Sequence, residues 1–163
     1  MGQKGRLRHR WWVRGRRPPG RCDRRFASAY LLAAVEPATG ADLALVLPAV
    51  TTAATNLFLA TFAAGPAEDV HAAPVLDGAG RHGSRGLVVP ANVALVPLPP
   101  YSPELDPVER VWLYLRERFL SPRVSADYRA VVDACCDAWR RLVAEPGRLR
   151  SLCDQPWIRK VRS

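Results

Sequence analysis

The sequence predicts an α/β protein in which a mixed sheet is flanked by helices. Apolar segments typical of strands dominate residues 7–47, a helix and further strands follow up to residue 98, and two amphipathic helices come last. The chain has 163 residues, of which 48% are hydrophobic. This length suits one domain with its own core, and the composition is too apolar for general disorder.

Residues 7–47 are expected to form an antiparallel meander of three strands. Residues 7–14 and 25–35 favour extended structure, and the segment 15–20 between them has the glycines and prolines of a turn. The third strand covers residues 43–47, after a Pro-Ala-Thr-Gly turn.

The middle of the chain predicts one helix and two strands. The threonines at 51–52 can cap a helix that ends near residue 65, where glycine precedes proline. The apolar run 70–76 predicts a buried strand, although Pro74 lacks the N–H that a central strand needs. A second apolar run predicts a strand over 93–98.

Two amphipathic helices are predicted in the last third of the chain. The first covers 107–120 and has one apolar stripe, formed by Val108, Val111, Trp112, Leu115 and Phe119. The second covers about 126–143 and is expected to bury Tyr128, Val131, Val132, Cys135, Trp139 and Leu142.

The net charge is concentrated at one end of the chain. The 24 basic and 15 acidic residues give a formal net charge of +9, and residues 1–25 carry all of it. This pattern predicts a basic hairpin whose cations hold phosphates while tryptophans stack on bases. A solvated basic surface without a ligand is the alternative. The residues expected to contact DNA are Lys4, Arg6, Arg8, Arg10, Trp11, Trp12, Arg14, Arg16 and Arg17.

Secretion, membrane insertion and a cysteine metal site are not indicated. The basic start runs into tryptophans rather than an apolar core, unlike a secretory signal. The uncharged stretch 43–67 contains Pro48, Asn56 and several threonines, unlike a membrane span. No C-x-x-C pair occurs, so we expect buried free thiols in a reducing cytosol, at Cys22, Cys135, Cys136 and Cys153.

Asp77 and Glu109 are the acidic residues whose positions suggest catalysis. Asp77 ends an apolar strand, where α/β sheets open onto a cleft, and Glu109 lies in the first turn of a helix. Two such carboxylates could share divalent cations that serve phosphodiester chemistry. Each also has a simpler interpretation. Asp77-Gly78 is an ordinary turn, and the four residues 106–109 approach a capping box.

The segment 98–112, LPPYSPELDPVERVW, resembles the signature of bacterial insertion-sequence transposases of the mariner-related DDE superfamily. It departs from the motif P-P-Y-S-P-x-L-N-P-I/V-E-x-x-W at one fixed position, where Asp106 replaces Asn. Residues 77–82 are similar to the family's D-x-A-x-x-H element, and residues 11–18 to its W-x-x-R-G-x-x-P element. The motif residues with expected structural roles are His82, Pro100, Tyr101, Ser102, Pro103, Pro107 and Trp112.

The resemblance implies an RNase H-like fold in which Asp77 and Glu109 are the second and third metal-binding acids, with Mg²⁺ or Mn²⁺ as cofactor. In the family, the first acid and its strand come just before the element matched by residues 11–18. The first catalytic strand and its Asp are therefore expected to be missing. The expected organisation is a basic hairpin at 1–25 within a partial catalytic domain at 1–122, followed by a helical extension at 123–163.

Three functions are compatible with the sequence. The first is a partial transposase catalytic domain for DNA cleavage and strand transfer, inactive alone, with transposon ends and target DNA as partners. Self-association or a complementing N-terminal fragment would then be expected. The second is a non-enzymatic nucleic-acid-binding protein that uses the basic segment, and the third is a gene relic without function. The expected location is the bacterial cytoplasm, with nucleoid association when DNA is bound and without membrane contact.

If the basic segment holds about five phosphates, DNA affinity should fall by roughly two to three decades between about 50 and 200 mM salt. Fluorescence anisotropy with a labelled duplex would measure this dependence. An affinity that does not change with salt would contradict phosphate binding by residues 1–25.

Overall fold

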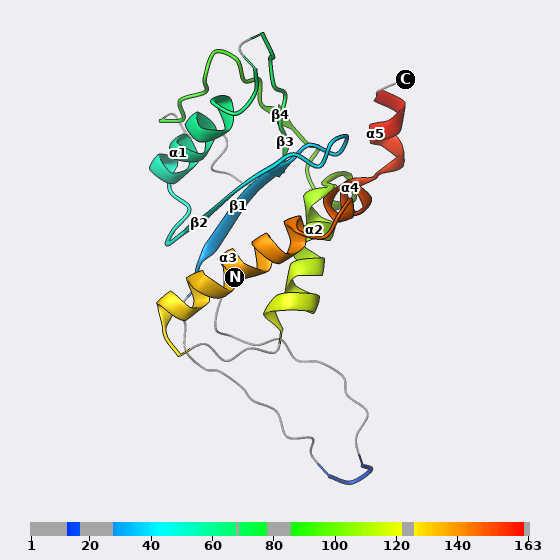
Figure 1. Cartoon of the computed structure of the whole chain (residues 1–163). Helices are drawn as coiled ribbons and strands as arrows, with labels where there is room; N and C mark the ends of the chain where they lie inside the picture. Colours follow the sequence, from blue (N-terminus) through cyan, green and yellow to red (C-terminus); the bar gives the residue numbers. More distant parts are fainter. Residues whose placement is uncertain (1–12, 17–27, 68, 78–85, 122–125, 162–163) are drawn as a thin grey trace.

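The computed structural model describes residues 13–16, 28–67, 69–77, 86–121 and 126–161. In these residues a two-stranded antiparallel sheet and a two-stranded parallel sheet are combined with helices (Figure 1). The predicted α/β class is therefore confirmed, but the described strands form two separate sheets rather than the single mixed sheet that was expected.

The antiparallel sheet pairs β1 (Tyr30–Val35) with β2 (Asp42–Leu47), and Tyr30 lies opposite Leu47. The turn between them is closed by the Gly40 N–H, which donates to the Glu36 carbonyl over 2.8 Å. Gly40 has φ +80°, a left-handed conformation that favours glycine. The strand expected over 43–47 is confirmed, and most of the strand expected over 7–14 lies outside the described residues.

Helix α1 (Thr52–Ala63) begins where the threonines predicted it. The Thr51 side chain accepts a hydrogen bond from the Ala54 N–H over 3.1 Å, as an N-cap residue does. Farther along α1, the Asn56 side chain donates to the Gly86 carbonyl and accepts from the Val88 N–H. These two bonds fix the chain segment that leads to the parallel sheet.

The parallel sheet contains β3 (Val75–Leu76) and β4 (Val96–Pro97). An isolated parallel bridge between Ala72 and Val93 continues the pairing toward the amino ends of the strands. The Val96 N–H donates a hydrogen bond to the Pro74 carbonyl over 3.0 Å. This bond lies between the isolated bridge and the strand pair.

The strands predicted over 70–76 and 93–98 are shorter than expected. Pro74 faces β4 and has no N–H to donate, so the ladder is interrupted at that position. The prediction that residues 70–76 are buried is wrong, because Val70 and Val75 are 45% and 38% exposed. Since β3 pairs with a single strand among the described residues, it has the exposure of an edge strand rather than a central one.

Six helical segments follow the parallel sheet among the described residues, and the first is a short 3-10 helix, η1 (Pro103–Leu105). Helix α2 (Val108–Leu115) continues into a π-helical turn, η2 (Arg116–Leu120). Then come α3 (Tyr128–Val143), α4 (Arg148–Cys153) and α5 (Pro156–Val161). The two predicted amphipathic helices are thus confirmed, while α4 and α5 were not predicted. None of the described helices has the length and apolar character needed to cross a bilayer.

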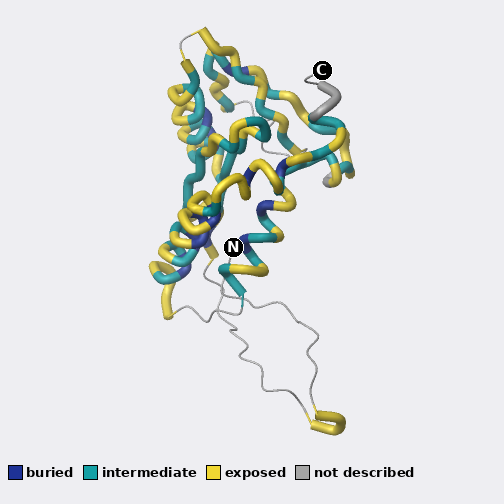
Figure 2. The backbone as a smooth tube through the Cα atoms, turned by 45° about the vertical axis from the view of Figure 1, so that its right-hand side comes forward, coloured by how far each residue is buried: buried dark blue, intermediate teal, exposed yellow. Residues whose placement is uncertain are grey.

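The core lies between β1–β2 on one side and α2, α3 and α4 on the other, with α1 on the opposite side of the hairpin (Figure 1). Alternate β1 side chains, Leu31, Ala33 and Val35, pack against the buried helix residues. Figure 2 shows buried residues alternating with exposed ones along these helices. The buried cluster consists of Val111, Leu115, Ala138, Trp139, Leu142, Leu149 and Cys153.

Two predictions about α3 need correction. Tyr128 was expected to be buried but is exposed, because it occupies the first position of α3, beside the N-cap Asp127. Cys135 and Cys153 are buried free thiols as predicted, whereas Cys136 is half-buried because it follows Cys135 around the helix and leaves the apolar face. Cys22 lies outside the described residues.

Replacing Leu115 by alanine should lower the free energy of unfolding by about 2–5 kcal/mol. The side chain is fully buried, and its removal leaves a cavity into which the surrounding residues relax only partly. Urea denaturation would measure the loss. Leu113→Ala, on the exposed face of the same helix, is the matched control and should cost less than about 1 kcal/mol. Equal losses would contradict the described orientation of α2.

Candidate active site

The candidate site begins at the carboxyl ends of the two parallel strands. The Leu98 N–H donates to the Leu76 carbonyl over 2.8 Å, so the start of the 98–112 segment lies beside the end of β3. Asp77 follows directly and is exposed. Because the carboxyl ends of parallel strands meet at one edge, Asp77 and residues 98–112 share that edge.

The loop after β4 returns to the same edge. It passes through Tyr101 and a short 3-10 helix, η1 (Pro103–Leu105), in which the Leu105 N–H donates to the Ser102 carbonyl. Asp106 then lies close enough to Asp77 for the charge of Asp77 to raise the pKa of Asp106. Two acidic residues from distant parts of the sequence are thus brought together.

Asp106 combines a structural and an electrostatic role. Its Oδ1 accepts a hydrogen bond from the Val108 N–H over 3.0 Å at the start of α2. Burial raises its pKa most, the Val108 bond lowers it, and the Asp77 charge raises it, with a net increase. The predicted helix start at Pro107 is shifted by one residue: α2 begins at Val108, and Pro107 is its N-cap, with φ −65°.

Cys153, the last residue of α4, belongs to the buried core cluster against which Val108 of α2 packs. Burial and, next, the negative charge of Asp106 raise the pKa of its thiol to about 11. The thiol therefore stays protonated and packs as an apolar group in the buried core cluster.

Glu109 lies in the first turn of α2 and is exposed, while Val108 and Trp112 pack toward the core. A capping box would need the Asp106 N–H to donate to the Glu109 carboxylate, and no such bond joins these two described residues. The helix start therefore depends on Asp106, and the Glu109 carboxylate faces solvent.

A divalent cation fits these residues in part. Carboxylate oxygens are the ligands that Mg²⁺ and Mn²⁺ favour, and the negative potential at Asp106 and Asp77 would attract a cation. Within the described ranges, no three His, Cys, Asp or Glu side chains gather to hold a metal. A bound cation would supply activation of the attacking oxygen and stabilisation of the leaving oxygen.

The other described signature residues lie in the loop before α2 or within α2. Pro100 is exposed, and the Ser102 hydroxyl donates to its carbonyl over 3.4 Å. Tyr101 is fully exposed and has φ +59°, a conformation that costs an L-residue about 1–2 kcal/mol. Trp112 packs on Trp139, with ring centroids 6.3 Å apart.

Most residues of the predicted DNA contact lie outside the described ranges, as do His82 and the Pro103 side chain. Of the nine, Arg14 and Arg16 are described. Both are exposed, in a turn closed by the Arg16 N–H and the Val13 carbonyl. The other seven remain sequence predictions.

Sequence reasoning treated Asp106 only as a cap and as a departure from the motif. It missed that the charge of Asp77 acts on Asp106. The replacement of an amide by a carboxylate at the one mismatched position was the available indication.

Asp106→Asn should raise the melting temperature at pH 7. A raised pKa in the folded state means that stability is complete below the unfolded pKa and is lost as pH rises through the folded value. Asparagine keeps the acceptor for the Val108 N–H and removes the charge. The gain should vanish near pH 3, and Asp133→Asn, on the exposed face of α3, controls for the lost charge. A lower melting temperature at pH 7 would contradict this electrostatic account.

Comparison with known proteins agrees with the sequence motifs. Residues 1–131 match the family described as DDE superfamily endonuclease. An uncharacterized protein of Sinorhizobium fredii, y4pE/y4sA, is 41% identical over 132 residues, which cover 81% of this chain and 98% of that protein. No solved structure matches. The chain therefore belongs to the DDE superfamily endonuclease family.

Proposed function

We propose that the chain is part of a transposase catalytic domain with an RNase H-like fold, which cleaves and joins DNA strands at transposon ends and target. One observation carries the proposal: in a DDE-family chain, Asp77 at the end of β3 and the 98–112 segment meet at one sheet edge. The cleavage and joining reactions would take place in the bacterial cytoplasm, on DNA of the nucleoid.

Asp77 and Glu109 are proposed to hold Mg²⁺ or Mn²⁺, and Asp106 to position Glu109. Asp106 fixes the first turn of α2 through the Val108 N–H, and Glu109 is the next residue in that turn. The solvent exposure of Asp77 and Glu109 suits groups that must meet both a hydrated cation and a DNA phosphate.

The resemblance implies three metal-binding acids. Within these 163 residues, Asp77 and Glu109 match the second and the third of them. Two carboxylates hold a cation weakly and position a second one poorly. We therefore propose that residues 1–163 do not cleave DNA efficiently alone, and that an acid from outside these residues completes the site. A complementing N-terminal fragment is the proposed source.

Non-enzymatic DNA binding is the second candidate function. It is favoured by the location of the whole net charge within residues 1–25 and by the exposure of Arg14 and Arg16. The two proposals differ in one respect: simple binding does not require Asp77 or Glu109.

The chain alone should produce no nicking of supercoiled plasmid above background in Mg²⁺ or Mn²⁺. Adding a separately expressed transposase fragment that carries the first-acid strand should restore metal-dependent nicking, because the third carboxylate then completes the site. Gel electrophoresis of the plasmid measures the nicked fraction.

In the complemented reaction, Asp77→Asn and Glu109→Gln should each return nicking to background. Glu104→Gln, an exposed acid of the same segment, is the matched control and should leave nicking unchanged. Nicking by the chain alone that Glu109→Gln abolishes would contradict the need for an external acid. Nicking that survives both substitutions would refute the assigned metal ligands.

A further inference from the structure

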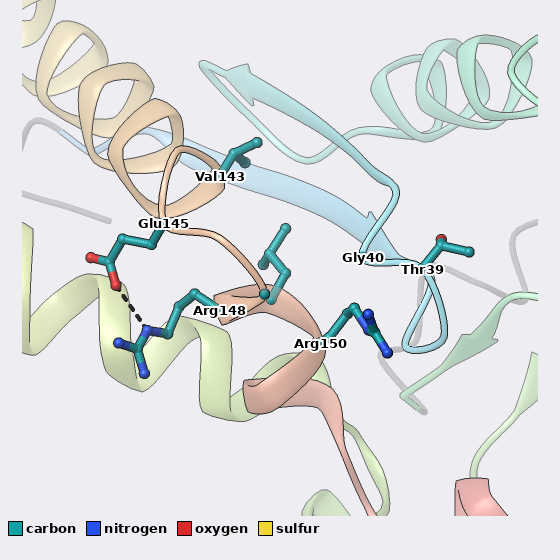
Figure 3. A pocket seen from close by; sticks show the side chains of 8 residues that line it. Thr39, Gly40, Val143, Glu145, Arg148 and Arg150 are labelled. Atoms are coloured by element: carbon teal, nitrogen blue, oxygen red, sulfur yellow. Dashed lines mark hydrogen bonds and ion pairs between the residues drawn. The ribbon is translucent and has the colours of Figure 1, made fainter.

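A cluster around Glu145 is formed by residues that do not belong to the candidate active site. Glu145, in the turn between α3 and α4, accepts hydrogen bonds from the Tyr114 hydroxyl at 3.0 and 2.7 Å. The Arg148 Nε donates to Glu145 Oε2 over 2.8 Å, as Figure 3 shows, and the Arg118 Nε lies 3.4 Å from Oε1. One carboxylate therefore holds two guanidinium groups.

Both guanidinium groups also lie over the Tyr114 ring. The central guanidinium carbons of Arg118 and Arg148 are 5.9 and 5.4 Å from the ring centroid, within cation–π distance. Phe119 adds a second ring 5.9 Å from Arg118. Long arginine side chains normally lose rotamer freedom on binding a ligand, and this stacking fixes the two arginines beforehand.

The charges of the cluster do not balance. Two guanidinium groups share the single Glu145 carboxylate, so one positive charge is in excess. Each arginine contacts Glu145 through Nε. Arg118 and Arg148 are also 61% and 44% exposed, so a ligand can reach both side chains.

The surface beside the cluster is also basic. A cavity of about 260 Å³ is lined by Glu145, Arg148, Arg150, Thr39 and Gly40, among others (Figure 3). A Cβ on Gly40 would lie 3.1 Å from the Arg150 Cγ, so the glycine leaves room for the Arg150 stem. Two of the residues that line this cavity are arginines, Arg148 and Arg150, and one is an acid, Glu145.

We propose that Arg118 and Arg148, with Arg150 beside them, bind the phosphodiester backbone of duplex DNA, at a site separate from the one formed by Asp77 and Glu109. Guanidinium groups match phosphate oxygens in pairs. The inference rests on the proposed function for its ligand. Arg148 and Arg150 lie beyond residues 1–131, which match the family.

The test is fluorescence anisotropy of the whole chain with a labelled 30-base-pair duplex over a range of salt concentrations. The double variant Arg118→Gln/Arg148→Gln should bind roughly 10- to 100-fold more weakly at about 0.1 M salt. Its plot of log affinity against log salt should lose about two units of slope, because two phosphate contacts are removed. Arg140→Gln/Arg141→Gln, on the exposed face of α3, removes the same charge and should retain the wild-type slope.

A second pair of variants separates binding from a structural role. Glu145→Gln keeps an acceptor for the Tyr114 hydroxyl and removes the shared negative charge, so it should tighten binding more than Asp137→Asn does. A purely structural role for Glu145 predicts equal or weaker binding instead. If the double arginine variant fails to fold by circular dichroism, Arg118→Gln alone and Glu145→Gln decide the question.

Equal losses in the two double arginine variants, or an unchanged salt slope, would overturn the proposal. A wild-type chain that does not bind duplex DNA would overturn both this inference and the proposed function. DNA binding and complemented cleavage that persist unchanged in Arg118→Gln/Arg148→Gln would overturn this inference alone.

Discussion

The hydrogen bond from the Trp139 indole to the Asp42 carboxylate, 2.8 Å long, is the contact on which the arrangement of the core depends. It joins the first residue of β2 to a helix 97 positions later in the chain. Trp139 is buried, so losing the partner of its N–H would cost about 1–3 kcal/mol. Trp112 packs on the same indole, and Val111 and Leu115 of α2 share the buried core cluster with Trp139. The location of Glu109 therefore follows from an interaction far from the candidate site.

The candidate site combines elements that are fixed in different ways. Asp77 is placed by backbone pairing between β3 and β4, and that pair is tied to α1 by the side chains of Asn56 and Asn92. Asp106 and Glu109 are placed by α2, which is fixed by the apolar core. The proline-rich loop between Leu98 and Asp106 is the chain segment that connects these two units.

The elements that could be predicted are those that are specified by patterns within their own stretch of sequence. The apolar stripe of α2 and the Thr51 cap of α1 are local patterns, and both helices lie where these patterns placed them. The resemblance at 98–112 identified the family. The exposure of Val70 and Val75 could not be predicted, because it depends on how many strands pair with β3. The approach of Asp106 to Asp77 and the Glu145 cluster also escaped prediction, because both depend on contacts between distant segments.

The interrupted ladder at Pro74 has a consequence for the order in which the molecule opens. Amide hydrogens of α2 and α3 belong to the buried core and should exchange with solvent only when that core unfolds. The β3–β4 pair has few rungs and exposed valines, so it should open separately and more often. Asp77 thus belongs to the less stable unit and Glu109 to the more stable one. A cation that bridges them would slow exchange in β3 and β4 by coupling the opening of the two units.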